Sequence, residues 1–328
     1  MKKLILLTLI GFTFSFLVAC GGGSGEVDAD GGPSAPDVIK FGVQPSLQPV
    51  HIAYTNGMFD DIEEKYGTTF ELIQFDAGGP QNTALAANEI SWAQYGMAPS
   101  VVGMASADAL LVAINILEQT AIISDKSIES VADLEGKNVG FPGKGSQQYP
   151  LILKALEEAG LEESDINLLQ MNAANMYTAL EQGELEAYIA WDPHTTRALY
   201  SDAGKVLTRA EEIMPLKDGH YLGEGVVVKS SFANDYPELT KDIIEVLKAT
   251  NDYIVDNLTE TPAIWSEAIG LDEDIINFSL DNSMSIYIKD ISPDMEDLVP
   301  YVHMLNEFEI TQIDDVESFL EERIYSTE

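Results

Sequence analysis

Short apolar segments alternate with amphipathic stretches of helical length along most of this chain. Residues 38–43 and 70–75 alternate apolar with other residues and predict strands, whereas the alanine-rich stretch 81–88 predicts a helix. The other elements predicted before residue 120 are a helix at 50–56, a strand at 92–96, a helix at 101–107 and a strand at 110–117. Strands followed by helices at this spacing predict a parallel α/β sheet.

The alternation starts again near residue 138 and predicts a second α/β unit. Its predicted elements are strands at 138–141, 166–171 and 188–191 and helices at 147–159, 175–182 and 194–203. One more strand is predicted at 226–228, and then helices at 238–256, 261–269, 272–282, 294–307 and 314–324. We interpret this pattern as two α/β lobes, with the helical tail packed on the first.

The first residues have the layout of a secretory signal. Lys2 and Lys3 precede an apolar segment that ends at Val18, which is shorter than the roughly 20 residues of a bilayer span. Leu17-Val18-Ala19-Cys20 resembles a bacterial lipobox, in which the cysteine is lipidated and the chain is cut before it. An ordinary signal peptide with an uninvolved cysteine is the alternative. The polar, glycine-rich stretch 21–37 predicts a flexible tether.

The composition excludes some classes of partner. Cys20 is the only cysteine, so the chain forms no internal disulfide, and 17 Lys and Arg against 55 Asp and Glu give a formal net charge of −38. Such a surface repels nucleic acid and anionic lipid, so we expect no nucleic-acid partner. The acidic excess suits either a saline or alkaline exterior or simple solubility of a secreted protein, and the sequence leaves both open.

Residue types that carry catalysis are sparse and scattered. His51, His194, His220 and His303 do not pair at ligand spacing such as i, i+4, and no HExxH, GxSxG or GxxxxGK[ST] motif occurs. The run from Gly140 to Ser146 resembles a phosphate loop only in composition, because its lysine is misplaced. We therefore expect no catalytic residue, no metal and no cofactor.

Each predicted lobe carries a glycine-containing loop between a strand and a helix. The loops are Gly78-Gly79-Pro80-Gln81 and Gly143-Lys144-Gly145-Ser146-Gln147-Gln148. Helix amino termini carry free N–H groups and about half a positive charge, and in open α/β sheets such loops line a cleft. The glycines alone could be turn residues and Ser146 an N-cap. Because two matching lobes carry such a loop, we favour a shared ligand cleft.

Trp191-Asp192-Pro193 ends a predicted strand. Trp191 is either a core residue or a stacking platform for a ligand, and Asp192 either caps the next helix or accepts a hydrogen bond from the ligand. Lys144 is the only base of its loop. It is either a counter-charge for an anion or a solvated lysine.

These segments resemble a known family. Residues 130–140 (SVADLEGKNVG), the Gly143–Ser146 loop, residues 179–187 (ALEQGELEA) and Trp191-Asp192-Pro193 are similar to the second lobe of solute-binding lipoproteins of ABC importers for sulfonates, taurine and nitrate, which include thiamine-pyrimidine-precursor binders. Gly42-Val43-Gln44 and Gly57-Met58-Phe59 are similar to the first lobe of that family. The resemblance implies an α/β, two-lobed periplasmic-binding-protein fold (type II) with a hinge between the lobes.

The resemblance also implies a domain plan. A lipoprotein signal peptide would span residues 1–19 and a tether residues 20–37. Lobe 1 would comprise residues 38–117 plus 224–328, and lobe 2 residues 118–222, with crossings near 115–120 and 219–225. The ligand would lie between the lobes. By position in matching loops, its contacts would be Gln44, Gly79, Pro80, Gln81, Ser146, Gln147, Gln148, Trp191, Asp192 and Glu224, with Lys144 as a possible countercharge.

The function implied is the capture of a small polar solute, an aliphatic sulfonate or taurine, for an ABC permease and its ATPase. The protein would be a monomer held at the membrane by lipid on Cys20. Because Asp192 and Glu224 favour an amine, a zwitterion such as taurine fits, and so does a pyrimidine stacked on Trp191. An exported enzyme of the same fold and a sensor component are the alternatives. Enzymes of this fold would be expected as cytosolic chains with nucleophilic cysteines or histidines, so the export signal and the lack of further cysteines argue against an enzyme.

Overall fold

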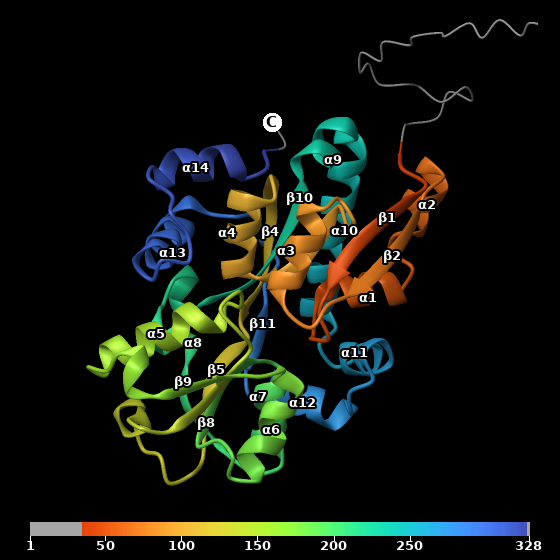
Figure 1. Ribbon diagram of the computed structural model, residues 1–328. Coiled ribbons are helices and arrows are strands. Elements are labelled where there is room, and N and C mark those ends of the chain that lie inside the picture. The colour runs from red at the N-terminus through yellow and green to blue at the C-terminus, as the bar shows by residue number, and fades with distance from the viewer. Residues whose placement is uncertain (1–34, 327–328) are drawn as a thin grey trace, which may run out of the picture.

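A computed structural model describes residues 35–326 of the chain as two β-sheets, each covered by helices (Figure 1). The first sheet has the spatial order β11 (Ser285–Tyr287), β4 (Ala109–Glu118), β10 (Leu222–Lys229), β3 (Trp92–Gly96), β1 (Val38–Val43) and β2 (Thr69–Gln74). The second has the order β7 (Asn167–Gln170), β6 (Asn138–Phe141), β8 (Ala187–Trp191), β5 (Thr120–Ser124) and β9 (Lys205–Arg209). We call the first sheet with its helices lobe 1 and the second sheet with its helices lobe 2. The predicted signal peptide, Cys20 and the tether up to residue 34 lie outside the described residues.

Helices cover both faces of each sheet because the strands are apolar on both faces, and β8 and β10 are buried along their whole length. In lobe 1, α3 (Gly78–Ala86), α4 (Met97–Ser106), α13 (Met295–Glu307) and α14 (Val316–Arg323) pack on one face. The other face carries α1 (Pro49–Thr55), α2 (Asp60–Tyr66), α9 (Ser230–Asp235) and α10 (Pro237–Asp256). In lobe 2, α5 (Gln148–Glu158) and α8 (Ala210–Ile213) lie opposite α6 (Ala173–Glu181) and α7 (His194–Tyr200).

Both sheets are mixed, so the expectation of purely parallel sheets was wrong. Strand β1 is parallel to β2 and β3, but β10 is antiparallel to β3 and β4. Likewise β6 is parallel to β7 and β8, whereas β5 is antiparallel to β8 and β9. The strands that run opposite to the other strands of their sheets are β5, β10 and β11. Each of them begins just after the chain has passed from one lobe to the other.

The chain crosses between the lobes at Glu118–Thr120 and again between β9 and β10. At the first crossing Glu118 and Gln119 have positive φ values of 64° and 76°. The sequence analysis ended a strand at residue 117 and placed a crossing near 115–120, but it missed β5, since neither residue of this turn is the glycine that usually marks one. At the second crossing, a Cβ atom on Gly223 would lie 2.8 Å from the carbonyl oxygens of Glu118 and Ile116. The two crossing segments therefore lie backbone to backbone.

The helical tail follows the predicted ranges closely but does not pack on lobe 1 alone. Helix α11 (Thr261–Ile269) contacts α1 of lobe 1, whereas α12 (Glu273–Asp281) contacts α7 of lobe 2. Figure 1 places α12 beside α6 and α7 in the lower half of the molecule. Strand β11, which the sequence did not predict, then returns the chain to lobe 1. The tail thus adds a third link between the lobes.

Candidate ligand-binding site

A small cavity lies between the two lobes. Lobe 1 and the first crossing contribute Gln44, Gly78, Gly96, Pro99, Gln119 and Glu224, and lobe 2 contributes Ser146, Gln147, Gln148 and Trp191. The cavity volume is about 20 Å³, which is room for about one water molecule. The two lobes are therefore closed on each other.

The fold places these residues where strands end and helices begin. Gln44 follows β1, Gly96 ends β3, and Ser146 lies in the loop after β6. Trp191 is the last residue of β8. Because the carboxyl ends of parallel strands meet at one edge of a sheet, the two lobes present these loops to each other across the cleft.

Glu224 is the acid of the cavity and is 1% exposed. Ser46 Oγ donates to its Oε1 at 3.3 Å, and Gln48 Nε2 and Gln94 Nε2 donate to its Oε2 at 2.9 and 3.0 Å. Burial raises the pKa of Glu224 to about 7, although these donors and the neighbouring Gln119 amide oppose the rise. The carboxyl group is therefore held in position and titrates near neutral pH.

Gln147 reaches across the cleft from lobe 2. Its Oε1 accepts a hydrogen bond from the backbone N–H of Met97, the first residue of α4. Gly96 makes this approach possible, since a Cβ atom there would lie 2.8 Å from Gln147 Oε1. The next residue, Gln148, donates from Nε2 to Thr120 Oγ1 at 2.9 Å. An amide oxygen of lobe 2 thus occupies the amino terminus of a lobe 1 helix.

One buried N–H donor of the cavity, Trp191 Nε1, lacks a hydrogen-bond partner, in a residue that is 5% exposed. Gln119 Nε2 makes no direct hydrogen bond either, but its amide lies beside the Glu224 carboxylate. The Trp191 ring packs its edge against His194, with ring centroids 5.3 Å apart. Burial and the nearby Arg197 lower the pKa of His194 to about 4, so that ring is neutral. Because buried polar groups are usually paired, the Trp191 indole N–H favours a ligand that brings an acceptor oxygen.

Asp192 lies outside the lining of the cavity, although the sequence placed it among the contacts. Its carboxylate accepts hydrogen bonds from Thr196, from Ser279 of α12 and, at 3.1 Å, from Ser285 of β11. Burial raises its pKa, and these hydroxyls oppose the rise. In this structure Asp192 fastens lobe 2 to the helical tail.

Lys144 also lies outside the lining. Its side chain is 66% exposed, 3.5 Å from Glu163, and its Nζ is 4.9 Å from the centroid of the Tyr149 ring. Gly79 and Pro80 lie at the outer mouth of the cleft, where Gly79 meets Gly145 of lobe 2. Gln81 is fully buried and donates from Nε2 to the Gln94 carbonyl at 3.1 Å. Six of the predicted contacts do line the cavity, namely Gln44, Ser146, Gln147, Gln148, Trp191 and Glu224.

Sequence reasoning missed four lining residues, Gly78, Gly96, Pro99 and Gln119. Gly96 and Pro99 open a helix directly after a strand, which is the same signal that singled out the other two glycine loops. Gly78 was named as part of its loop but not as a contact. Gln119 gave no signal, because it lies after the predicted strand at 110–117 in a turn that contains no glycine.

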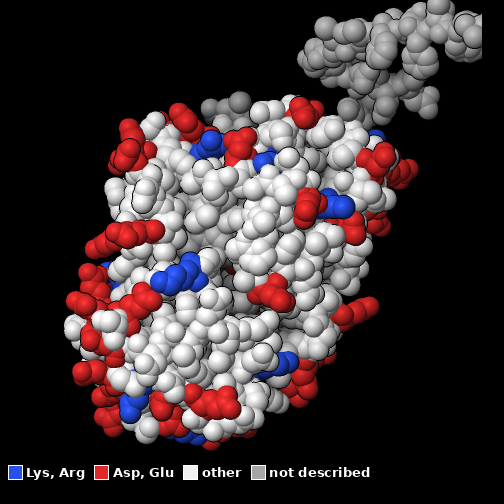
Figure 2. Space-filling model, in the orientation of Figure 1, with Lys and Arg blue, Asp and Glu red and all other residues white. Residues whose placement is uncertain are grey.

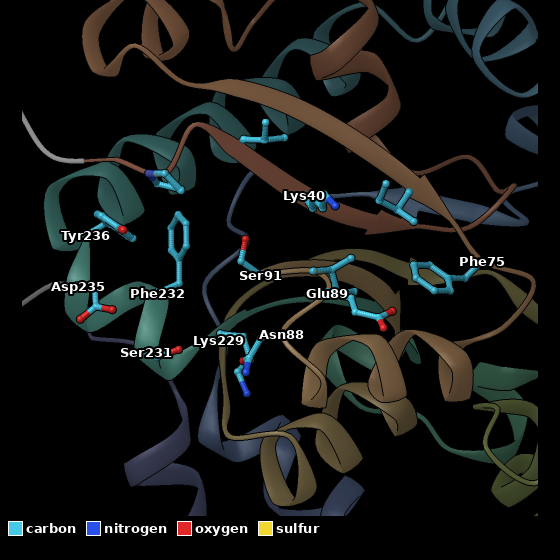
Figure 3. Close-up of a pocket in the computed structure, with 14 residues that line it drawn as sticks. Lys40, Phe75, Asn88, Glu89, Ser91, Lys229, Ser231, Phe232, Asp235 and Tyr236 are labelled. Carbon is cyan, nitrogen blue, oxygen red and sulfur yellow. The ribbon is translucent and has the colours of Figure 1, made fainter. Parts of the chain in front are cut away.

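A larger hollow of about 660 Å³ lies on lobe 1, away from the cleft (Figure 3). Figure 3 shows Phe75 and Glu89 at one end and Phe232 and Tyr236 at the other. Lys229 also lines the hollow, and its Nζ donates a hydrogen bond to the Ala107 carbonyl at 2.6 Å. Among the described residues, none of those lining this hollow has a buried polar side-chain atom without a partner. The smaller cavity between the lobes is therefore the better candidate.

The distribution of charges and of possible metal ligands does not point to another site. Figure 2 shows acidic side chains mostly toward the edges of the visible face, whereas its middle is mainly uncharged apart from one basic and one acidic cluster. Between residues 35 and 326 no group of three or more His, Cys, Asp or Glu residues is arranged to hold a metal ion. No helix of that same range is long and apolar enough to cross a membrane.

Two α/β lobes, joined by chain crossings and with a cavity between them, define the periplasmic-binding-protein fold. The chain belongs to the NMT1-like family, whose sequence profile matches residues 36–265. It is 27% identical over 290 residues to the "Putative aliphatic sulfonates-binding protein" of Bacillus subtilis (strain 168), covering 86% of this chain and 82% of that protein.

Solved structures support the same fold. The periplasmic aliphatic sulphonate binding protein SsuA from Escherichia coli aligns with a TM-score of 0.72 at 21% identity, over 89% of this chain and 93% of that chain. The alkanesulfonate-binding protein SsuA from Xanthomonas axonopodis pv. citri, bound to MOPS, aligns with a TM-score of 0.74 at 18% identity, over 88% and 98%. The prediction of a two-lobed α/β binding-protein fold is thereby confirmed.

Proposed function

We propose that this protein is the extracytoplasmic solute-binding component of an ABC importer, and that its solute is an aliphatic sulfonate or taurine. The observation that carries the proposal is a buried donor without a partner, Trp191 Nε1, in a cavity between two lobes. A sulfonate group presents several acceptor oxygens to such a donor. The names of the relatives in the family agree with this class of solute.

Capture requires the lobes to open, because a cavity of about 20 Å³ admits no sulfonate. The two crossings provide the hinge, and the loop from Ser146 to Gln148 moves away from α4 as lobe 2 swings out. The solute then binds and the lobes close over it. A permease would recognise the closed form, so that binding and delivery are coupled through one conformational equilibrium.

We propose a binding protein rather than an enzyme. The cavity is lined by amides, a hydroxyl, an indole and one carboxyl group, and the Ser146 hydroxyl donates to the Gly143 carbonyl at 2.7 Å rather than to a base. The named sulfonate-binding relatives are binding proteins as well. Transport, rather than sensing, is the role we propose, with a permease and its ATPase as partners and a monomer as the working form.

We further propose that lipid on Cys20 holds the protein at the outer side of the membrane. The lipobox-like Leu17-Val18-Ala19-Cys20 supports this. Replacing the thiol (Cys20→Ala) is expected to move the protein from the membrane fraction of its native host to the soluble fraction. Continued sedimentation of the variant with membranes would contradict lipid anchoring and leave the solute-binding proposal intact.

A thermal-unfolding screen tests the solute class. The panel contains taurine, ethanesulfonate, nitrate and a hydroxymethylpyrimidine, because a ligand at 100 times its dissociation constant adds about 2.7 kcal/mol of stability. A rise in melting temperature with the sulfonates supports the proposal. A rise with the pyrimidine alone would indicate that the solute is a heterocycle that stacks on Trp191, not a sulfonate. No rise with any compound would contradict it.

A further inference from the structure

Two carboxyl groups, one from each lobe, meet at the hinge. Glu118 is the last residue of β4, where the chain leaves lobe 1, and Glu211 belongs to α8 of lobe 2. The Glu211 carboxyl lies within hydrogen-bonding reach of the Glu118 carboxyl. We call these two residues the hinge pair. Neither of them lines the cavity between the lobes, so the hinge pair joins the lobes outside the solute site.

The hinge pair has two buried oxygens to which no group donates a hydrogen bond. Glu118 Oε1 accepts from the Tyr221 N–H at 2.9 Å and lies 3.0 Å from His220 Nδ1. Glu118 Oε2 and Glu211 Oε2 are both buried and have no partner. Two ionised carboxylates can only accept, so they would repel each other here. A proton on one of them turns the contact into an O–H···O hydrogen bond between the lobes.

No lysine or arginine offsets the charge of the hinge pair. In the part of the chain that the structure describes, none forms an ion pair with Glu118 or Glu211. The one basic neighbour is His220 on the second crossing, whose side chain is 40% exposed and is charged only when protonated. Burial, followed by the Glu211 carboxyl, raises the pKa of Glu118 to about 9. The closed form therefore keeps the proton at neutral pH.

The other groups packed around Glu118 bring it no positive charge. The Tyr221 hydroxyl bonds to that of Tyr301 in α13 at 2.7 Å, and burial raises the pKa of both hydroxyls. From β11, Ser285 is the strand partner of Glu118, and its own hydroxyl donates to Asp192 at 3.1 Å. Burial raises the pKa of Asp192 as well. The separation of the two acids of the hinge pair is therefore what controls their proton.

Opening of the lobes would separate the hinge pair. The turn of the first crossing begins at Glu118, because Glu118 and Gln119 have φ values of 64° and 76°. Glu211 moves with lobe 2, since α8 packs on β9 and α5. Rotation about the crossing thus changes the distance between the two carboxyl groups. Once apart and hydrated, a glutamate returns to its ordinary pKa of about 4.5 and releases its proton at neutral pH.

We propose that the hinge pair is a proton-dependent closing contact: a proton shared between Glu118 and Glu211 holds the lobes together, and its loss lets them open. This inference goes beyond the proposed solute-binding function, because the contact acts with or without a solute. The advantage of the closed form is fully present below about pH 4.5 and is lost as the pH rises toward 9. One exchanged proton changes the ratio of closed to open molecules by at most about tenfold per pH unit.

Distance measurement by pulsed electron paramagnetic resonance on the purified full chain, without solute, tests this contact. Spin labels at Glu71→Cys and Leu169→Cys, with Cys20→Ser, report the separation of β2 and β7. These are the edge strands farthest from the crossing strands in their sheets. From pH 6.5 to pH 9 we expect the longer distance to gain population, with the closed-to-open ratio falling at least about threefold.

Variants of the hinge pair assign the proton. In Glu118→Gln a neutral amide donates to Glu211 at every pH, so the closed-to-open ratio should stay constant. Glu267→Gln removes one exposed acid from α11 and serves as the charge-matched control, which should keep the wild-type response to pH. If Glu118→Gln does not fold, Glu211→Gln makes the same test from lobe 2.

The contrary results are distinct. A wild-type ratio that stays constant between pH 6.5 and pH 9, or that shifts toward the closed form as the pH rises, overturns the proposal. A wild-type response to pH in a folded Glu118→Gln or Glu211→Gln variant also overturns it. Because no solute is added, these outcomes leave the proposed solute-binding function untouched.

Discussion

The two walls of the cleft are built differently. In lobe 1, Glu224 lies within a strand and is held by side chains from β3 and from the loop after β1. In lobe 2, Ser146 and Gln147 belong to a loop that begins with Gly143 at φ 133°, and Gln147 makes its contact on the opposite lobe. The rigidly held side chains of lobe 1 are suited to selecting the solute. The loop of lobe 2, which contacts lobe 1 directly, is suited to closing the cleft. The comparison assigns specificity to lobe 1 and the closing contact to lobe 2.

Removing the aromatic ring of lobe 2 should have the largest effect on binding. The change Trp191→Ala deletes a buried ring that lines the cavity, and a ring against a ligand contributes roughly 1–3 kcal/mol. We expect solute affinity, measured by titration calorimetry, to fall about tenfold or more. The variant Trp191→Phe keeps a ring but lacks the N–H, so its solute affinity should lie between those of the wild type and Trp191→Ala. Wild-type affinity in Trp191→Ala would remove Trp191 from the site.

Blocking the closing contact should have the next largest effect. A methyl group at Gly96 would lie 2.8 Å from Gln147 Oε1 and 2.9 Å from its Cβ, so Gly96→Ala opposes closure. We expect a penalty of about 1 kcal/mol, which is about fivefold in affinity. The double variant Gly96→Ala with Gln147→Gly removes both of these Gln147 atoms and should recover most of the loss. A double variant as weak as Gly96→Ala would place the obstruction elsewhere.

The stability of the first crossing between the lobes should depend on pH through Glu118. Glu118 is 2% exposed, and its Oε1 accepts from the Tyr221 N–H at 2.9 Å and lies 3.0 Å from His220 Nδ1. Burial and the neighbouring Glu211 carboxyl raise the pKa of Glu118 to about 9. The folded state therefore holds a proton that the unfolded chain releases above about pH 4.5. The stability that this proton contributes is fully present below that pH and is lost as the pH rises toward 9.

Glu118→Gln tests this proton, because glutamine imitates the neutral acid and can donate to Glu211. Its melting temperature should fall less between pH 6 and pH 9 than that of the wild type, by a few degrees, since 1 kcal/mol corresponds to about 2–4 °C in a chain of this size. Parallel melting curves of the two proteins over this range would show that Glu118 is already ionised at pH 6.

Removing the exposed base at the cleft mouth should have the smallest effect. Lys144 is 66% exposed, pairs with Glu163 at 3.5 Å and does not line the cavity. We expect Lys144→Ala to change solute affinity less than about twofold, because exposed ion pairs contribute little. A tenfold loss in calorimetry would instead place the acidic group of the solute beside Lys144, at the outer mouth.

The sequence predicted the parts of this site that follow from local signals. Loops with glycine between a strand and a helix located Ser146, Gln147 and Gln148, and the end of an apolar strand located Trp191. Gln119 could not be predicted, because its turn uses positive φ without glycine. Asp192 was placed in the cleft because its hydroxyl partners, Ser279 and Ser285, lie 87 and 93 residues away in the chain. Contacts of that range arise only when the helical tail packs on lobe 2.

A fluorescence titration tests most directly whether the solute binds between the lobes. Trp92 and Trp265 are fully buried in the apolar cores of lobe 1, whereas Trp191 lines the cavity. Our account predicts a saturable change of tryptophan emission when taurine is added to the wild-type protein, and no change in Trp191→Phe saturated with taurine. An undiminished change in that variant, or calorimetric binding to the wild type without any change in emission, would contradict a site in the cleft.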